Sequence, residues 1–219
     1  MRRCTSVATL VVLLGVVCVC AGRDTAPAAI HLAFGEEYGT YAVGWLTGDK
    51  TSTSTVKYGS SKSALDATAT GSCSESDIFG IGHAHEVVLS ALPGGEVVYY
   101  QVGDAEGGWS GVYAFRTTRE AKAAQPYTFG IYGDLGVTNG ANTMRGINSH
   151  APEWDFVVHA GDISYANDHP LEETKVWREF FGTLQPTMTS IPYMVGAGNH
   201  EYVPPPPIPS VCTPCVMEM

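Results

Sequence analysis

The segment YTFGIYGDLG, residues 127–136, has a design that the chain uses three times: an apolar run, then glycine, then a side chain that can bind metal. The second copy is WDFVVHAGDISY, residues 154–165, and the third is IPYMVGAGNHE, residues 191–201. Apolar runs bounded by glycines, with helix-patterned segments between them, predict βαβ units and a parallel sheet covered on both faces. Ligands of such sheets bind beyond the carboxyl ends of the strands, so we expect the polar clusters to converge on one edge.

The side chains that follow the three runs are mostly hard oxygen donors with one imidazole: Asp134, Asp162, Tyr165, Asn199 and His200. This set is suited to Fe(III) beside a softer divalent ion. A carboxylate such as that of Asp162 can bridge two metals about 3.5 to 4 Å apart. Tyr165 favours ferric iron over Mg or Ca, because a phenol of pKa about 10 binds well only when a strong Lewis acid removes its proton.

In their order and spacing, the motifs Gly133-Asp134-Leu135-Gly136, Gly161-Asp162-Ile163-Ser164-Tyr165 and Gly198-Asn199-His200-Glu201 resemble the first three of the five metal-ligand motifs of purple acid phosphatases. The resemblance covers roughly residues 29–202. It implies Asp134 and Tyr165 as terminal ligands of Fe(III), Asp162 as the bridge, and Asn199 on a divalent ion, Zn, Mn or Fe. His200 would be catalytic and face the substrate phosphate. The implied activity is that of a secreted acid phosphatase, which hydrolyses phosphate monoesters through a metal-bound hydroxide.

The family's remaining ligands come from a Val-x-x-His and a Gly-His-x-His motif, and no histidine follows His200 in this sequence. Residues 203–219 instead form a proline-rich, irregular tail. We therefore expect a carboxy-terminally truncated chain with impaired activity. Two alternatives stay open: a noncatalytic secreted β-sandwich module with a residual, metal-poor half-domain, or another metallophosphoesterase such as a nucleotide or diester hydrolase, which Tyr165 argues against.

Residues 1–22 read as a secretory signal peptide, with Arg2 and Arg3 before a short apolar run and small residues at Ala21 and Gly22. The run is too short for a membrane span, so we expect export to the extracellular space and no membrane attachment after the signal is removed; a single anchor helix is the alternative. The six cysteines include three in this segment. Of the other three, Cys73 is expected to be a lone thiol or half of a bridge, and Cys212 and Cys215 have no context for redox or zinc chemistry.

The formal net charge of -10 makes nucleic acid an unsuitable partner. Small phosphate monoesters are the expected ligands, because bound cations would dominate the local field at contact distance. The sequence leaves the oligomeric state open, a homodimer included.

Residues 28–118 show short β segments separated by turn signals, which predicts a two-sheet sandwich of about 90 residues. It resembles the fibronectin type III-like amino-terminal domain of plant-type, high-molecular-weight purple acid phosphatases, on the stretches 56–59 and 98–104. Residues 119–126 read as a linker, and residues 127–202 as a partial α/β metallophosphoesterase domain. Within that domain we expect helices at 142–148 and at 172–184, the second closed by Pro186, and a satisfied core histidine at His159.

Overall fold

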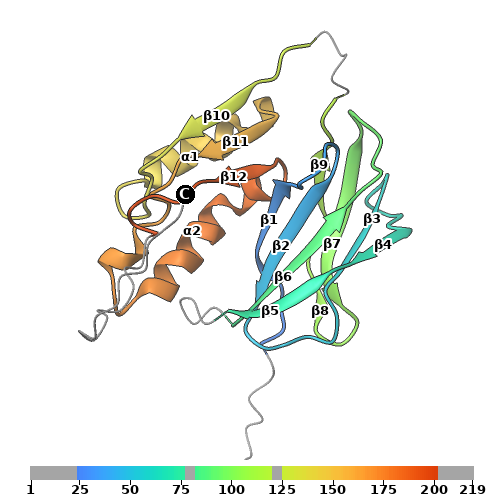
Figure 1. The fold of residues 1–219 in the computed structure, drawn as a ribbon, viewed down its shortest axis with the longest axis horizontal. Coiled ribbons are helices and arrows are strands. Elements are labelled where there is room, and N and C mark those ends of the chain that lie inside the picture. Colours follow the sequence, from blue (N-terminus) through green and yellow to red (C-terminus); the bar gives the residue numbers. More distant parts are fainter. Residues whose placement is uncertain (1–23, 77–81, 120–124, 202–219) are drawn as a thin grey trace, which may run out of the picture.

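The structure, a computed structural model, describes residues 24–76, 82–119 and 125–201, shown in colour in Figure 1. The expected signal peptide, most of the expected linker and the proline-rich tail lie outside these residues. An antiparallel sandwich and a parallel α/β unit lie side by side (Figure 1). Across the described ranges, no helix is both long enough and apolar enough to cross a bilayer.

The sandwich consists of two antiparallel sheets. The first has the strand order β1 (Ala28–Phe34), β2 (Tyr41–Thr47), β6 (Gly82–Leu89) and β5 (Ser72–Ser76). The second has the order β4 (Ala67–Thr70), β3 (Thr55–Gly59), β7 (Val97–Asp104) and β8 (Gly108–Trp109), and β9 (Tyr113–Arg116) also pairs with β7. The predicted sandwich is therefore present, with three short strands, β4, β5 and β8, that the sequence pattern did not reveal.

The core between these two sheets follows the side-chain period of two that strands impose. In β7, Val98, Tyr100 and Val102 are buried, and the residues between them are only partly buried. They pack in one cluster with apolar side chains of the other sheet, which include Val43 and Trp45 of β2. The unpredicted strands β4 and β5 consist of small and polar residues, which give no apolar alternation to detect.

The second unit is a parallel sheet with helical crossovers. Its elements are, in chain order, β10 (Phe129–Tyr132), α1 (Ala141–His150), η2 (Ala151–Glu153), β11 (Phe156–His159), η3 (Ala166–Asp168), α2 (Glu173–Met188) and β12 (Tyr193–Val195). All three expected strands and both expected helices are present. The expected end of the second helix is wrong, because α2 runs through Pro186 to Met188. Thr187 and Met188 are buried in the core, and this packing holds the last turn despite the proline.

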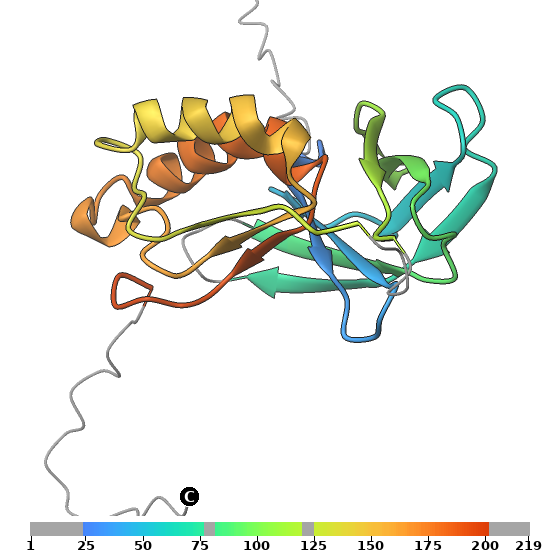
Figure 2. The same cartoon turned by 90° about the horizontal axis from the view of Figure 1, so that it is seen from above.

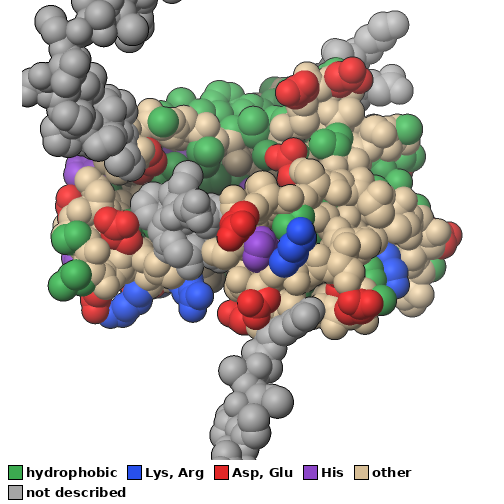
Figure 3. Space-filling view, turned by 60° about the horizontal axis from the view of Figure 1, so that its bottom comes forward, with side chains coloured by type: hydrophobic (Ala, Val, Ile, Leu, Met, Phe, Trp, Pro, Cys, Tyr) green, Lys and Arg blue, Asp and Glu red, His purple; other side chains and the backbone are tan. Residues whose placement is uncertain are grey.

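The expectation of a sheet covered on both faces is also wrong for the described residues. The strand order is β10-β11-β12, so both crossovers step in the same direction and place α1 and α2 on the same face (Figure 2). On the face without helices, Phe129 and Ile131 are 48% and 66% exposed. This face is seen obliquely along the upper edge of Figure 3, where hydrophobic side chains are gathered.

The α/β unit docks on the sandwich mainly through α2. The Tyr100 hydroxyl in β7 donates a hydrogen bond of 2.9 Å to the carbonyl of Thr189, directly after α2. The Gln185 Nε2 atom donates to the Tyr113 hydroxyl at 3.0 Å, and the ring of Phe181 stacks on that of His31. The sandwich thus supports the helix that in turn covers the parallel sheet.

Candidate metal centre

The loops that follow β10 and β11 remain paired beyond the ends of these strands. The N–H groups of Asp134, Leu135 and Gly136 donate to the carbonyls of residues 161, 162 and 163, at 3.2, 3.1 and 3.0 Å. The parallel ladder therefore extends into the first two polar clusters and fixes their relative register.

Three residues of these loops that are not glycine have left-handed backbone conformations: Asp134, Asp162 and Tyr165, with φ of 50°, 52° and 56°. Such conformations are costly for residues with a Cβ, and they gather at sites where the fold imposes them. The third loop approaches closely as well, because a Cβ placed on Gly161 would lie 2.8 Å from the Cα of Gly198. Only glycine allows these two loops to touch at this point.

The first three predicted ligands converge. The Tyr165 hydroxyl donates to Asp134 Oδ1 at 3.1 Å, and Asp162 Oδ1 accepts the backbone N–H of His200 at 3.0 Å. Desolvation, together with the neighbouring Asp134 and Asp162 carboxylates, raises the pKa of the Tyr165 phenol to about 12. The site therefore carries concentrated negative charge that a cation would neutralise.

His200 lies at the same edge. Its ring centroid is 4.0 Å from that of Tyr165, and its Nδ1 atom is 2.9 Å from Asn167 Oδ1. Asp168 Oδ1 is 3.6 Å from the same nitrogen. Two acceptors beside Nδ1 favour the tautomer that carries its proton there, which leaves Nε2 for a ligand. Sequence reasoning missed Asn167 and Asp168, whose only signal is their position two and three residues after Tyr165.

Glu201, which sequence reasoning quoted but gave no role, joins two of the loops. One of its carboxylate oxygens accepts the N–H groups of Asp162 and Gly198, both at 2.9 Å. The other accepts the N–H of Ile163 at 2.8 Å. Three charge-assisted hydrogen bonds thus hold the second and third loops in one arrangement.

Asn199 differs from the other four predicted residues. It lies in the third loop, at the same edge, but it is exposed and its side chain makes no hydrogen bond with any residue that the structure describes. In residues 24–76, 82–119 and 125–201, no three His, Cys, Asp or Glu side chains are grouped as metal ligands. The cluster consists of two carboxylates, a phenol and an exposed amide.

His159 lies in β11, three residues before Asp162, and is fully buried. Its Nδ1 atom is 2.8 Å from the Tyr193 hydroxyl, which also accepts a hydrogen bond from the Tyr132 hydroxyl. Its Nε2 atom has no hydrogen-bond partner among the described residues. Burial lowers the pKa of His159. The prediction of a core histidine is confirmed.

The donor set fits Fe(III) better than it fits Mg or Ca. Asp134, Asp162 and Tyr165 supply three hard oxygen donors, and the phenol already points at a carboxylate. A phenol binds a metal ion well only when a strong Lewis acid removes its proton. A second ion would find fewer donors, since Asn199 is the remaining predicted ligand beside the shared Asp162.

Fold and site together define a class: an antiparallel sandwich followed by a parallel α/β unit whose strand-end loops collect oxygen donors suited to metal ions. Residues 27–117 match the family model of the purple acid phosphatase N-terminal domain. The chain is similar to curated purple acid phosphatases over about four fifths of its length.

Two curated relatives illustrate the match. The chain is 29% identical over 179 residues to Fe(3+)-Zn(2+) purple acid phosphatase 12 of Arabidopsis thaliana, covering 80% of this chain and 38% of the relative. It is 31% identical over 194 residues to acid phosphatase type 7 of Homo sapiens, covering 86% of this chain and 43% of the relative. The chain thus spans about two fifths of the length of these relatives.

A solved structure supports the fold. A purple acid phosphatase isolated from yellow lupin seeds superposes with a TM-score of 0.70 at 24% sequence identity, over 80% of this chain and 36% of that protein. At this identity the likeness concerns the fold alone.

Proposed function

We propose that the chain carries the iron-binding part of a secreted acid phosphatase that hydrolyses phosphate monoesters. The observation that carries the proposal is the convergence of Asp134, Asp162 and Tyr165 at the carboxyl ends of β10 and β11. The relationship to purple acid phosphatases supports it, and one of these relatives is named for Fe(3+) and Zn(2+). In this proposal residues 28–118 are a fibronectin type III-like sandwich, and residues 127–202 are part of a metallophosphoesterase domain.

Each residue then has a defined task. Asp134 and Tyr165 would hold Fe(III), with the Tyr165 hydroxyl, which now donates to Asp134, supplying a phenolate oxygen. Asp162 would be shared with a divalent ion, Zn, Mn or Fe, for which Asn199 is the other expected ligand. When bound, such a pair of ions activates water and neutralises charge on a phosphoryl group. His200 presents Nε2 to a phosphate oxygen, and Glu201 keeps the two loops in register.

The second ion is the weak point of the site. Among the residues that the structure describes, its expected ligands are Asp162 and Asn199. Two oxygen donors alone hold a divalent ion poorly. We therefore expect about one iron per chain and phosphatase activity near background. The exposed Asn199 side chain, which makes no hydrogen bond with a described residue, favours one alternative, a noncatalytic secreted module that keeps only a metal-poor half-site.

Iron titration with visible spectroscopy tests the proposal. A phenolate on Fe(III) gives a charge-transfer band in the visible, so the wild-type chain should become coloured as Fe(III) is added. Tyr165→Phe should remain colourless but keep part of its iron, because Asp134 and Asp162 still bind. The matched control is Tyr132→Phe, a tyrosine of the same sheet that lies among buried groups instead of the site.

Metal analysis and a p-nitrophenyl phosphate assay on the same samples complete the test. Iron binding no tighter in the wild type than in the double variant Asp134→Asn/Asp162→Asn would refute the proposed site. Two metals per chain, with turnover that is lost in Asp162→Ala, would show instead that further residues of this chain bind the second ion.

A further inference from the structure

Two adjoining hollows lie on either side of the hairpin that joins β1 and β2, far from the proposed iron site. The first has a volume of 380 Å³ and is lined by Phe34, residues 35–40, Thr118, Tyr127 and Phe156. The second, also 380 Å³, is lined by residues 37–41, 90–92, 94, 117 and 118. They share residues 37–40 and Thr118, so the tip of the hairpin is the ridge between them. A ligand that fills both must be extended.

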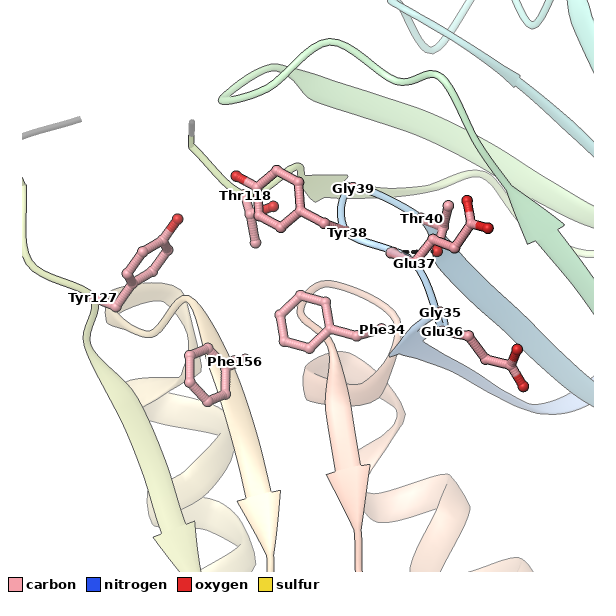
Figure 4. Close-up of a pocket in the computed structure, with 10 residues that line it drawn as sticks. All are labelled: Phe34, Gly35, Glu36, Glu37, Tyr38, Gly39, Thr40, Thr118, Tyr127 and Phe156. Atoms are coloured by element: carbon pink, nitrogen blue, oxygen red, sulfur yellow. Dashed lines mark hydrogen bonds between the residues drawn. The ribbon is translucent and has the colours of Figure 1, made fainter. Parts of the chain in front are cut away.

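The first hollow has aromatic walls that are already fixed. Figure 4 shows the rings of Phe34, Tyr38, Tyr127 and Phe156 around it. The hydroxyls of Tyr38 and Tyr127 both donate to the carbonyl of Arg119, at 2.9 Å each. The rings of Phe34 and Phe156 meet edge to face at 5.6 Å. With both hydroxyls engaged, the tyrosines present ring faces to the hollow, and little ordering is required when a ligand binds.

Exposed tyrosine rings and partly exposed phenylalanine rings in the first of two adjacent hollows suit an extended proline-rich segment. Such a segment already has the polyproline II conformation, with three residues per turn, so residues on one side of it enter neighbouring hollows at a small entropic cost. Tyr38 is 74% exposed and forms the ridge that such a segment would straddle.

The charge of the partner follows from Glu36 and Glu37. Both are exposed at the hairpin tip, and neither forms an ion pair with a residue in the described part of the chain. Their carboxylates point away from the rings (Figure 4). A lysine or arginine that flanks the proline-rich residues would meet them, and the net charge of -10 favours a basic partner generally. The chain's own residues 203–219 contain proline but no Lys or Arg, so they lack this complement.

We propose that the β1–β2 hairpin is a docking site for a basic, proline-rich segment of a partner protein. The apolar residues of that segment occupy the two hollows on either side of Tyr38, and its cationic residues pair with Glu36 and Glu37. This role does not depend on the proposed phosphatase activity.

Fluorescence anisotropy with labelled synthetic peptides tests the proposal on the full chain. The probe is a short peptide of alternating prolines and leucines that ends in two arginines. Saturable binding should weaken at least about tenfold in Tyr38→Ala, because the ridge between the hollows is removed. It should weaken about tenfold in Glu36→Gln/Glu37→Gln, and also when the arginines of the peptide are replaced by glutamates.

The matched control is Glu86→Gln/Glu179→Gln, which removes the same charge from two exposed positions on β6 and α2 and should leave the affinity unchanged. Tyr38 is exposed, so its variant should keep the wild-type circular dichroism spectrum. Absence of saturable binding overturns the proposal. So does binding that the Tyr38 variant retains, or an equal loss in both charge variants, which would indicate attraction by net charge alone. A peptide of residues 203–219 could also compete with the labelled probe. If it competed as strongly as the unlabelled basic peptide, the ligand would be the chain's own tail and the proposal of a basic partner would be overturned.

Discussion

At the scale of single residues, one carboxylate holds two loops of the proposed iron site. Glu201 accepts three backbone N–H groups, two from the second loop and one from the third. Those loops contain Asp162, the proposed bridge, and His200, the residue expected to meet the phosphate. Glu201 thus determines whether these side chains stay within reach of one another.

We therefore expect Glu201→Gln to lower the free energy of unfolding by about 2 kcal/mol, because the amide nitrogen of glutamine faces N–H groups that need an acceptor. Iron affinity should fall as well, since the two loops are no longer held together. Urea unfolding and iron titration measure the two effects. Glu172→Gln, at an exposed position where the carboxylate pairs with Lys175 on the surface, is the control and should change neither quantity appreciably. A Glu201 variant as stable as that control would show that the hydrogen bonds contribute little.

Residue types and their order predicted that Asp134, Asp162 and Tyr165 would lie at this edge. Asp134, Asp162 and Tyr165 follow strands with a clear apolar pattern, and the parallel arrangement brings them together. The partners of His200 and the hydrogen bonds of Glu201 were not predictable, because they depend on loop conformations with positive φ that no periodicity encodes. The unpartnered nitrogen of His159 is equally invisible in the sequence.

At the scale of elements, the helix-free face of the parallel sheet leaves apolar side chains in contact with solvent. Phe129 and Ile131 belong to β10, which is also an edge strand with one unpaired side. Exposed apolar residues on an edge strand favour association between chains. We therefore expect chains to self-associate through β10.

Ile131→Lys should reduce self-association and the binding of a hydrophobic dye, because a charge on an edge strand opposes pairing with another chain. Its free energy of unfolding should stay within about 0.5 kcal/mol of the wild-type value, as is usual for an exposed position. Light scattering, dye fluorescence and urea unfolding measure these quantities. Val157→Ala, in the adjacent strand on the helix-covered face, should instead cost about 2 kcal/mol and leave association unchanged. If Ile131→Lys scattered as much light as the wild type, the chains would associate through a surface other than β10.

The apolar periodicity of the sequence predicted most helices and strands, and tertiary packing determined where they end and which short strands form. The aromatic spacing in residues 177–184 predicted α2, but its continuation through Pro186 depends on the burial of Thr187 and Met188. The strands β4 and β5 carry no apolar alternation and exist because β3 and β6 offer them partners. Coverage of only one sheet face is a property of strand order, which residue patterns do not report.

At the scale of the whole molecule, sandwich and α/β unit share a buried polar contact. The Tyr100 side chain is fully buried in the sandwich core, and its hydroxyl reaches the carbonyl of Thr189 beyond the end of α2. Gln185 and Phe181 of α2 add contacts to Tyr113 and His31. The two parts therefore stabilise one another, and we expect them to unfold together.

Tyr100→Phe should lower the free energy of unfolding by about 1 to 2 kcal/mol, because it leaves the Thr189 carbonyl without its partner. The unfolding curves from far-ultraviolet and near-ultraviolet circular dichroism should coincide in the wild type, as in a two-state transition. Tyr99→Phe, on the opposite face of the same strand, is the control and should be nearly neutral. Two separate transitions in the wild type would contradict mutual stabilisation of the two parts.

The β10-β11-β12 order also bears on how the molecule is assembled during synthesis. Each strand of the parallel sheet pairs with the one that leaves the ribosome just before it, so this sheet grows in the direction of translation. The sandwich is different, because β2 pairs with β1 and β3 with β4 nearby in sequence, but each gains its second neighbour only when β6 or β7 has been made. Pairing between strands that are distant in the sequence slows folding. By the time β10 is made, the nascent sandwich already has all its strands, and α2 emerges onto a surface that is ready to receive it.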